Sequence, residues 1–524
     1  MKRNNEMKKI IILILALASV MLLASCSLDF QDKMEQMSEN LKDQIIDMVG
    51  DYIEKNTDTG SDEVLDNDSS SKPSDVPSIP STPSDIPSDV PSDEPSDIPT
   101  DSDSGDAPDV PVTPPEPEIP EYIVLEREKH PLSKYTGLDI FKLGSKINDK
   151  EYKFRTAYGY GRFETTLDDL MGSNPLAYFT ISGMETAVHV DFDLSKAKNE
   201  AAEGEIAFSD IASKIWEFSK KYCVNSLTSK LTRVEIGSNP DKTISASEYA
   251  LLMNLIYDNN CKQNGYDAEN PGTTFINPEI RLITGKMSSY NLPYIKELME
   301  QVKLIRDDDF SPIGGWSFSV NTQGKAPEEI FAENEALKEL IAFRNENYNS
   351  VEIHLSDFGW DTVNPESEIY IASSDKYSSE ELQAMYILRS FLILQGMDVD
   401  KASYDLLNDS DTSGHGIIAK DGAKKLSFTM LEYFKEKMDG MSLSEVVSDG
   451  ENDVYCYKFE NENGKTIYAF WSPNGASLNL SNQPQNATLS YYDPTVKSYT
   501  DQEITIGGGM FSKRINETVM FLEY

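Results

Sequence analysis

Three short segments of the chain carry polar residues that can do chemistry, each at the end of an apolar stretch. They are Val-Glu-Ile-Gly-Ser-Asn-Pro-Asp at 234–241, Leu-Ser-Asp-Phe-Gly-Trp-Asp-Thr at 355–362 and Tyr-Asp-Leu-Leu-Asn-Asp at 404–409. Carboxylates such as those of Glu235 and Asp357 can serve as general acids, general bases or nucleophiles. That chemistry requires a fold that brings distant parts of the chain together.

The elements that would position these segments alternate between strands and helices. Strand-like runs cover 176–181, 186–192, 233–236, 281–284, 350–355 and 402–407. Helix-like stretches lie among and after them, at 211–222, 247–257, 293–304, 328–343, 380–394 and 426–437. This alternation over about 300 residues predicts an α/β fold, a (β/α)8 TIM barrel, whose functional residues gather at the carboxyl ends of its strands.

The pattern changes after residue 440. Short strand-like runs separated by turn residues follow, and Asn463-Gly464 between two of them is a hairpin signal. We therefore expect a barrel at 121–440 and a small C-terminal accessory β domain at 441–524, with Trp471 in the core of that domain.

The three polar segments together resemble a known family. The segment at 234–241 is similar to Glu-Ile-Gly-Asn-Glu-Pro-Asp, which ends strand 4 in retaining (β/α)8 glycoside hydrolases of the family-5 and family-39 type. The segment at 355–362 resembles their Thr/Ser-Glu-Phe-Gly-Trp-Asp-Thr after strand 7, and 404–409 with Ser413-Gly414 resembles the strand-8 loop. The resemblance covers roughly 130–524 and implies a glycosidase-like barrel.

The same resemblance implies that the catalytic positions are degenerate. A retaining glycosidase needs two carboxyl groups about 5–5.5 Å apart, one as acid/base and one as nucleophile. The acid/base position falls on Asn239, whose amide has no proton to give a leaving group, and the nucleophile position falls on Asp357. An aspartate is one methylene shorter than the family's glutamate, and a misplacement of about 1 Å can cost on the order of 10²-fold. Glu235 is interpreted as a structural residue of the barrel.

A degenerate barrel can still bind sugars, which present apolar faces to aromatic rings. The alignment puts Trp316, Trp360 and Tyr404 at the ends of strands, so we predict that they line a substrate-binding cleft. Packing in the core is the alternative for each of them.

Other constellations predict no cofactor and no metal. His189 and Asp191 share a face of one expected strand, but the sequence offers no third ligand beside them. Cys223, Cys261 and Cys456 are too few for a disulfide framework, and free buried cysteines are expected, with a Cys223–Cys261 bridge as the alternative.

The N-terminus predicts export and lipid anchoring. Basic residues precede an apolar run from Ile10 to Ala24, which is too short to span a bilayer but suits a secretory signal at 1–25. Leu23-Ala24-Ser25-Cys26 resembles the bacterial lipobox, which implies diacylglyceryl transfer to Cys26 and attachment to the outer face of the membrane.

In residues 26–57, apolar side chains recur at the spacing of one helical face, which predicts a helical stalk. The stalk could lie on the membrane or pair with another copy of the chain, and a plain spacer helix is the alternative. Residues 58–120 are rich in Pro, Ser and Asp and predict a disordered, extended linker. Of the net charge of −42, this linker region carries a large share, so the body is only moderately acidic. Such a charge excludes nucleic acid as a default partner.

The sequence therefore predicts a lipid-anchored, surface-displayed pseudoenzyme that binds carbohydrate, a polysaccharide or a cell-wall glycan, through the old cleft. An active hydrolase with atypical catalytic residues and a protein-interaction scaffold are the alternatives.

Overall fold

The computed structural model describes residues 136–140, 160–170, 185–223, 231–265, 280–306, 311–405, 409–410 and 412–524. Cys26, the stalk, the linker and the expected strand at 176–181 lie outside these ranges. Within them, no helix combines the length and the apolar character needed to cross a bilayer.

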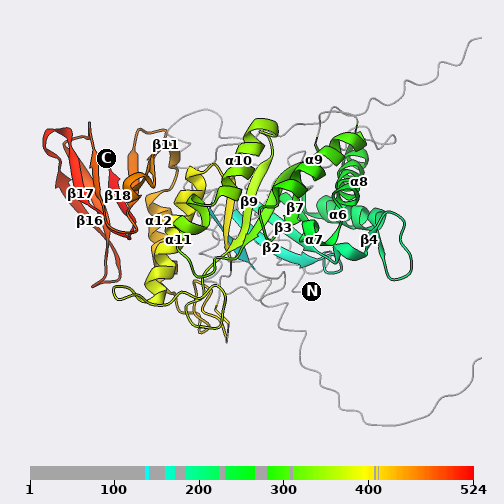
Figure 1. Ribbon diagram of the computed structural model, residues 1–524, viewed down its shortest axis with the longest axis horizontal. Helices are drawn as coiled ribbons and strands as arrows, with labels where there is room; N and C mark the ends of the chain where they lie inside the picture. Colours follow the sequence, from blue (N-terminus) through cyan, green and yellow to red (C-terminus); the bar gives the residue numbers. More distant parts are fainter. Residues whose placement is uncertain are drawn as a thin grey trace, which may run out of the picture. The chain divides into compact units, whose positions relative to one another are not determined.

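Eight parallel strands close into a barrel in the order β1-β10-β9-β8-β7-β6-β3-β2 (Figure 1). Their bounds are β1 Thr136–Ile140, β2 Tyr160–Thr166, β3 Glu185–Asp191, β6 Leu231–Ser238, β7 Arg281–Lys286, β8 Ile313–Val320, β9 Glu352–Phe358 and β10 Lys401–Asp405. The predicted (β/α)8 barrel is confirmed.

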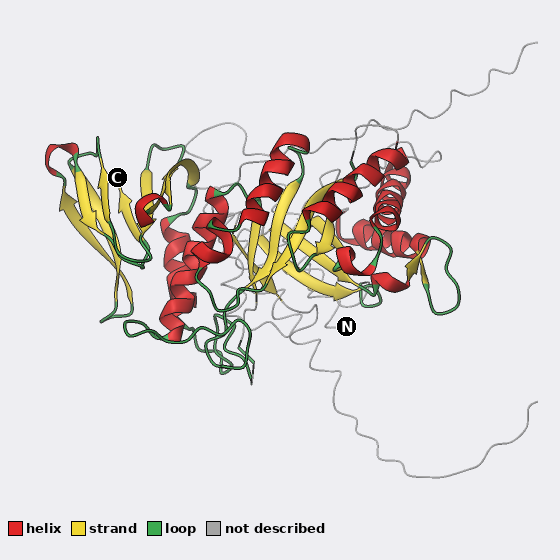
Figure 2. Cartoon of the chain, viewed as in Figure 1, coloured by secondary structure: helices red, strands yellow, loops and turns green. Residues whose placement is uncertain are grey.

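Helices flank the barrel strands (Figure 2). The long ones are α6 Phe208–Cys223, α8 Ala246–Gly265, α9 Leu292–Arg306, α10 Glu335–Asn347, α11 Ser379–Gly396 and α12 Leu426–Lys437; the short α7 spans Pro240–Thr243. Outward strand residues such as Val234 and Ile353 are fully buried against this layer in one apolar core. Burial of apolar area of this kind supplies most of the favourable free energy of folding.

One expected helix differs from the structure. The stretch 328–343 is not continuous: a single π-helical turn, η2 at Glu328–Ala332, ends before α10 begins at Glu335. Asn334 divides the two because its side chain accepts a hydrogen bond from the Leu337 backbone and caps α10.

The C-terminal region is the expected accessory β structure. A six-stranded antiparallel sheet runs in the order β11-β12-β13-β18-β15-β16, beside a β14-β17 pair. The bounds are β11 Ser442–Asp449, β12 Tyr455–Glu460, β13 Thr466–Trp471, β14 Ser477–Leu480, β15 Asn486–Asp493, β16 Ser498–Thr505, β17 Phe511–Arg514 and β18 Met520–Glu523. Gly464, with a positive φ of 80°, lies in the turn between β12 and β13, as the hairpin signal predicts. Cys456 on β12 is free and buried, as expected, whereas the side chains of Cys223 and Cys261 are outside the description.

Trp471 fastens this sheet to the barrel. Its ring is fully buried and stacks on Tyr455, and its indole N–H donates to Glu328 Oε1 at 2.6 Å. The other oxygen of Glu328 accepts from Arg389 on α11 at 2.8 Å. Trp471 is therefore a core residue, as predicted, at the junction between sheet and barrel.

The barrel interior is charged and paired. Glu352 on β9 accepts two hydrogen bonds of 2.7 Å from Arg233 on β6, and Glu235 accepts from Arg162 on β2 at 2.6 Å. Ser356 adds a hydrogen bond of 2.7 Å to Glu235. Although burial raises the pKa of Glu235, the adjacent Arg162 lowers it to about 2, so Glu235 is a charged structural residue.

Replacement of Glu235 tests this interior pairing. Glu235→Ala leaves the fully buried Arg162 without its carboxylate, and we expect the free energy of unfolding to fall by about 3–5 kcal/mol. Urea unfolding followed by circular dichroism measures it. Asp168→Ala, which breaks an exposed pair with Lys214, is the control and should cost about 0–1 kcal/mol. Equal losses in the two variants would contradict the interpretation.

Candidate functional site

The candidate site lies where the carboxyl ends of the parallel strands meet. Asn239 directly follows β6, the fourth barrel strand in chain order, and Asp357 lies near the end of β9, the seventh. These are the strand ends that the sequence resemblance implies. Lys286 ends β7, and Glu164 and His189 lie on β2 and β3. We call these five residues the barrel mouth.

A bulge in β9 turns Asp357 toward the barrel mouth. The register of β9 shifts by one residue before Asp357 against both of its neighbours, β8 and β10. Consecutive residues can then face the same side of the strand. Ser356 reaches Glu235 inside the barrel while Asp357 reaches Lys286. The bulge therefore adds a second polar group to the interior face at the site.

Lys286 bridges two carboxylates. Its Nζ atom lies 2.7 Å from Asp357 Oδ2 and 3.6 Å from Glu164 Oε2. The separation between Asp357 Oδ2 and Glu164 Oε2 therefore cannot exceed the sum of these two distances. That limit is only slightly above the separation of about 5–5.5 Å between the carboxyl groups of a retaining glycosidase.

Glu164 is held in its ionised form. Burial raises the pKa of its carboxyl group, but His189, Lys286 and Arg162 more than offset this and lower the pKa from 4.5 to about 2. The distance from His189 Nδ1 to Glu164 Oε2 is 3.7 Å, which is too long for a hydrogen bond. At neutral pH, Glu164 has no proton to donate.

Asn239 is held beside Lys286 by the backbone. Its N–H donates to the Lys286 carbonyl at 2.9 Å, and its left-handed conformation, φ 47°, starts the short helix α7. Gly285 makes the close approach of the two strands feasible, since a Cβ there would overlap the carbonyl oxygen of Gly237. The Asn239 side chain is half-buried at the barrel mouth.

His189 and Asp191 on β3 are joined by Ser238. The Ser238 hydroxyl donates to Asp191 Oδ1 at 2.8 Å and lies 3.1 Å from His189 Nε2. Among the described residues, no three His, Cys, Asp or Glu side chains are grouped as metal ligands. His189, Asp191 and the Ser238 hydroxyl form one polar wall of the barrel mouth.

The loops after β9 and β10 are fastened to each other at the rim. Asp361 Oδ1 accepts hydrogen bonds from the backbone of Val363, Asn364 and Gly414 at 2.8–3.1 Å. His415 lies over Gly359, where any Cβ would overlap its ring. Burial lowers the pKa of His415 to about 4, so its ring is neutral at physiological pH. The rim is thus preorganised.

The prediction that Trp316 lines a cleft is wrong in this structure. Its neighbour Ser317 faces the barrel interior, where it bonds Ser356, so Trp316 on β8 faces outward. There the indole is fully buried, stacked at 6.1 Å on Phe343 of α10 and edge-on to Tyr348.

Trp360 and Tyr404 are also buried in the core rather than open to a cleft. The Trp360 indole donates to the Lys325 carbonyl at 2.9 Å, and the Tyr404 hydroxyl donates to the His415 carbonyl at 2.8 Å. Both rings pack edge-on against Phe358. Their burial corrects the expectation of sugar-stacking aromatics and leaves them a role in shaping the rim.

Glu164 and Lys286 were missed by the sequence reasoning. Lys286 comes two residues after the expected strand at 281–284, and its place at a strand end could have drawn attention to it. Glu164 lies on β2, where the charged Arg162 and Glu164 flank Phe163. This alternation is typical of a strand with one solvent-exposed face, whereas Arg162 and Phe163 are both buried, so the sequence did not predict a buried strand here.

Comparisons with known proteins agree with the fold. The sequence matches no protein-family model and no curated protein. Among solved structures, a family 39 glycoside hydrolase from the gut symbiont Bacteroides cellulosilyticus WH2 is similar with a TM-score of 0.55 at 15% identity, over 77% of this chain and 82% of that one. The fold is that of glycoside hydrolase barrels. A GH30 endoxylanase from Clostridium papyrosolvens C71 is similar with a TM-score of 0.50 at 10% identity, over 76% of this chain and 97% of that one.

The influence of Lys286 on Glu164 can be measured directly. Lys286→Met keeps the volume of the side chain but removes the cation, which leaves Glu164 facing the like charge of Asp357. We expect the pKa of Glu164 to rise by about 1–3 units from its value of about 2. Titration of the carboxyl ¹³C resonance by NMR reports it, with Lys465→Met, in the turn between β12 and β13, as the control. An unchanged pKa in Lys286→Met would refute the bridging role.

Proposed function

We propose that the protein is a surface-anchored module that binds carbohydrate at the barrel mouth without cleaving it. The observation that carries this proposal is the Lys286 ammonium between Glu164 and Asp357, next to an amide at Asn239. A glycosidase must protonate its leaving oxygen with a carboxyl group that holds a proton at working pH. Here the amide has no acidic proton and Glu164 is ionised.

The nucleophile position is weakened by the same contact. Asp357 is held by Lys286 at 2.7 Å, and attack on an anomeric carbon would require that this charge-assisted hydrogen bond be given up. The shorter aspartate side chain also withdraws its oxygens from the position that a glutamate would reach. Both carboxylates are thus committed to the ion pair.

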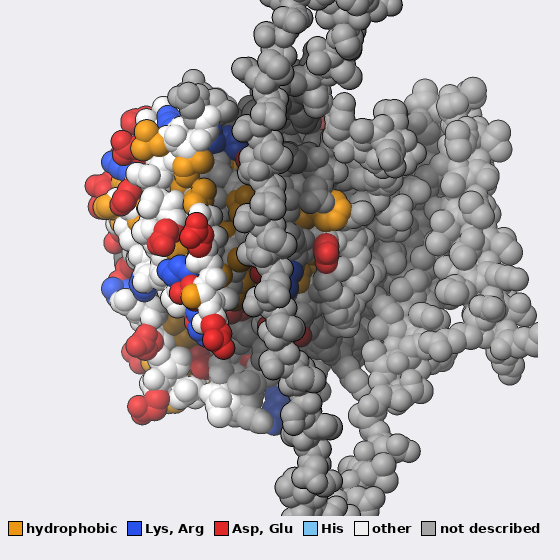
Figure 3. Space-filling model, turned by 90° about the vertical axis from the view of Figure 1, so that its right-hand side faces the viewer, with side chains coloured by type: hydrophobic (Ala, Val, Ile, Leu, Met, Phe, Trp, Pro, Cys, Tyr) orange, Lys and Arg blue, Asp and Glu red, His pale blue; other side chains and the backbone are white. Residues whose placement is uncertain are grey.

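The polar wall and the rim favour a sugar as the ligand. Ser238, Asp191 and Asn239 offer both donors and acceptors at the strand ends, which is where barrels of this fold carry their sites. Sugar hydroxyls need both kinds of partner. Because Lys286 is already neutralised by two carboxylates, we expect a neutral or amine-bearing saccharide rather than a uronate or a sulfated chain. On the described part of the face in Figure 3, acidic side chains are interspersed with basic ones.

An active hydrolase is the second candidate, and the closeness of Glu164 to Asp357 favours it. Displacement of Lys286 by a ligand would leave two carboxylates near the retaining separation. One of them would then take up a proton more readily, because like charges raise each other's pKa. This candidate requires turnover, which the first one excludes.

A glycan array followed by a reducing-sugar assay separates these functions. We expect wild-type protein to bind one class of neutral or amine-bearing glycan and to release no reducing sugar from it. Asn239→Ala combined with Asp191→Ala should weaken binding about tenfold or more, because hydrogen bonds to charged groups are lost. Asn349→Ala, an exposed change just before β9 at the opposite end of the barrel, is the matched control.

Three results would change the proposal. Release of reducing sugar that disappears in Asp357→Asn would establish the hydrolase. Binding that survives the double substitution would exclude the barrel mouth as the site. Capture of a protein partner without any glycan binding would favour the scaffold.

We further propose that the chain is held at the outer face of the membrane by a lipid on Cys26. The lipobox-like Leu-Ala-Ser-Cys at 23–26 supports this. With a labelled fatty acid in a bacterial host, we expect the wild-type chain to become labelled and to stay with membranes. Cys26→Ser should lose the label, with Cys456→Ser, a buried cysteine on β12, as the control. Equal labelling of Cys26→Ser and the wild type would refute the anchor.

A further inference from the structure

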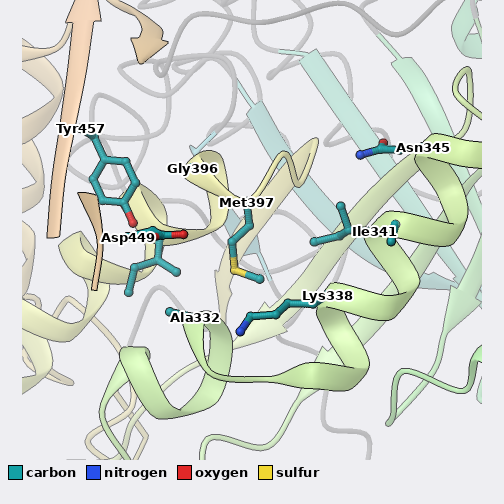
Figure 4. A pocket seen from close by; sticks show the side chains of 10 residues that line it. Ala332, Lys338, Ile341, Asn345, Gly396, Met397, Asp449 and Tyr457 are labelled. Atoms are coloured by element: carbon teal, nitrogen blue, oxygen red, sulfur yellow. The ribbon is translucent and has the colours of Figure 1, made fainter. Parts of the chain in front are cut away.

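A cavity lies away from the barrel mouth, at the seam between helices α10 and α11 and the strands β11 and β12. Its volume is about 360 Å³, within the range of about 300–1,000 Å³ that small-molecule sites occupy. Its lining combines the apolar side chains of Ile341, Ile393 and Met397 with polar ones. Figure 4 shows Ile341 and Met397 between the polar side chains of Asp449, Lys338 and Asn345. We call this cavity the seam pocket.

Tyr457 lines the seam pocket with a ring and a hydroxyl group. The residue is 2% exposed and belongs to the cavity lining. Burial raises the pKa of this hydroxyl, and the nearby Asp449 carboxylate raises it further. Figure 4 shows the hydroxyl directed toward Asp449. A phenolic hydroxyl that lines a cavity can donate a hydrogen bond to a ligand there or accept one from it.

The position of Tyr457 depends on Gly396. A Cβ at Gly396, the last residue of α11, would overlap the Tyr457 ring. The φ angle of Gly396 is not positive, so its lack of a side chain serves packing rather than backbone conformation. The wall of the pocket is therefore built by a close fit between α11 and β12.

Opposite charges stand on two walls of the pocket. Lys338 extends from α10, and Asp449 ends β11 (Figure 4). The two do not form an ion pair with each other; Lys338 is instead 2.9 Å from Glu335 in an exposed pair of the kind that breaks at little cost. A ligand with one positive and one negative end could satisfy both walls at once.

We propose that the seam pocket binds a small amphipathic zwitterion, an α-amino acid or a dipeptide with apolar side chains. Its carboxylate would face Lys338, its ammonium group would face Asp449 and the Tyr457 hydroxyl, and its side chain would cover Ile341 and Met397. A neutral saccharide would offer no charged group to either Lys338 or Asp449. The site is independent of the proposed function at the barrel mouth.

Calorimetric titration of the full chain with leucyl-leucine tests the proposal. We expect saturable binding at millimolar or lower concentration, weakened about tenfold or more in Lys338→Met and in Asp449→Asn. Tyr457→Phe should weaken it about threefold to tenfold through loss of one hydrogen bond. Lys214→Met is the matched control, and the double substitution at Asn239 and Asp191 should leave dipeptide binding unchanged.

Ligand variants make the assignment of each end specific. The C-terminal amide of leucyl-leucine lacks the carboxylate and should bind more weakly to wild-type protein, but with no further loss in Lys338→Met. The N-acetylated dipeptide lacks the ammonium group and should also bind more weakly to wild-type protein, but with no further loss in Asp449→Asn. Absence of dipeptide binding, binding of both blocked dipeptides with the full affinity of leucyl-leucine, or preferential binding of a neutral disaccharide that Tyr457→Phe abolishes would each overturn the proposal.

Discussion

Charged side chains that turn into the barrel are neutralised there by partners from other strands, and the arrangement at the barrel mouth follows from this constraint. An ion buried without a partner costs several kcal/mol, so each inward carboxylate needs a cation in reach. Glu352 has Arg233 and Arg281, and Glu235 has Arg162. One layer higher, Lys286 serves both Glu164 and Asp357. The rule that stabilises the barrel interior thus also holds Glu164 and Asp357 as ionised carboxylates beside Lys286.

The barrel fold and the residues at its mouth can be considered separately. The fold is that of glycoside hydrolase barrels, with a bulge in β9 and a preorganised rim. Within it, an amide stands at one strand end and a lysine bridges two carboxylates. Such polar groups can form hydrogen bonds with sugar hydroxyls without acting as a general acid, and that is the physical basis of the proposal of binding without turnover.

Much of the fold follows from local pattern. Helix α12 begins and ends at the residues that amphipathic spacing indicates, Leu426 and Lys437. The strand ends that carry Asn239 and Asp357 were also foreseen, because motifs fix the place of a residue in the chain.

The directions of side chains were harder to foresee. Side chains alternate between the two faces of a strand, so Trp316 faces outward because its neighbour Ser317 on β8 faces the barrel interior. Trp360 follows the bulge in β9, which shifts this alternation by one residue. A one-residue shift reverses the face of a strand residue, and no sequence pattern marks it. Glu164 could not be picked out from the sequence, because its strand alternates charged and apolar residues. Its role at the barrel mouth depends on its contact with Lys286, which is distant in the sequence.

The most direct test of the central claim is intact-protein mass spectrometry after incubation with activated 2-deoxy-2-fluoro glycosides, which trap the covalent intermediate of a retaining glycosidase. The ionised, lysine-bridged pair predicts that the wild-type mass stays unchanged with every sugar that the protein binds. A mass increase of one fluorosugar, located by peptide mapping to Asp357, would contradict the account and identify a working nucleophile.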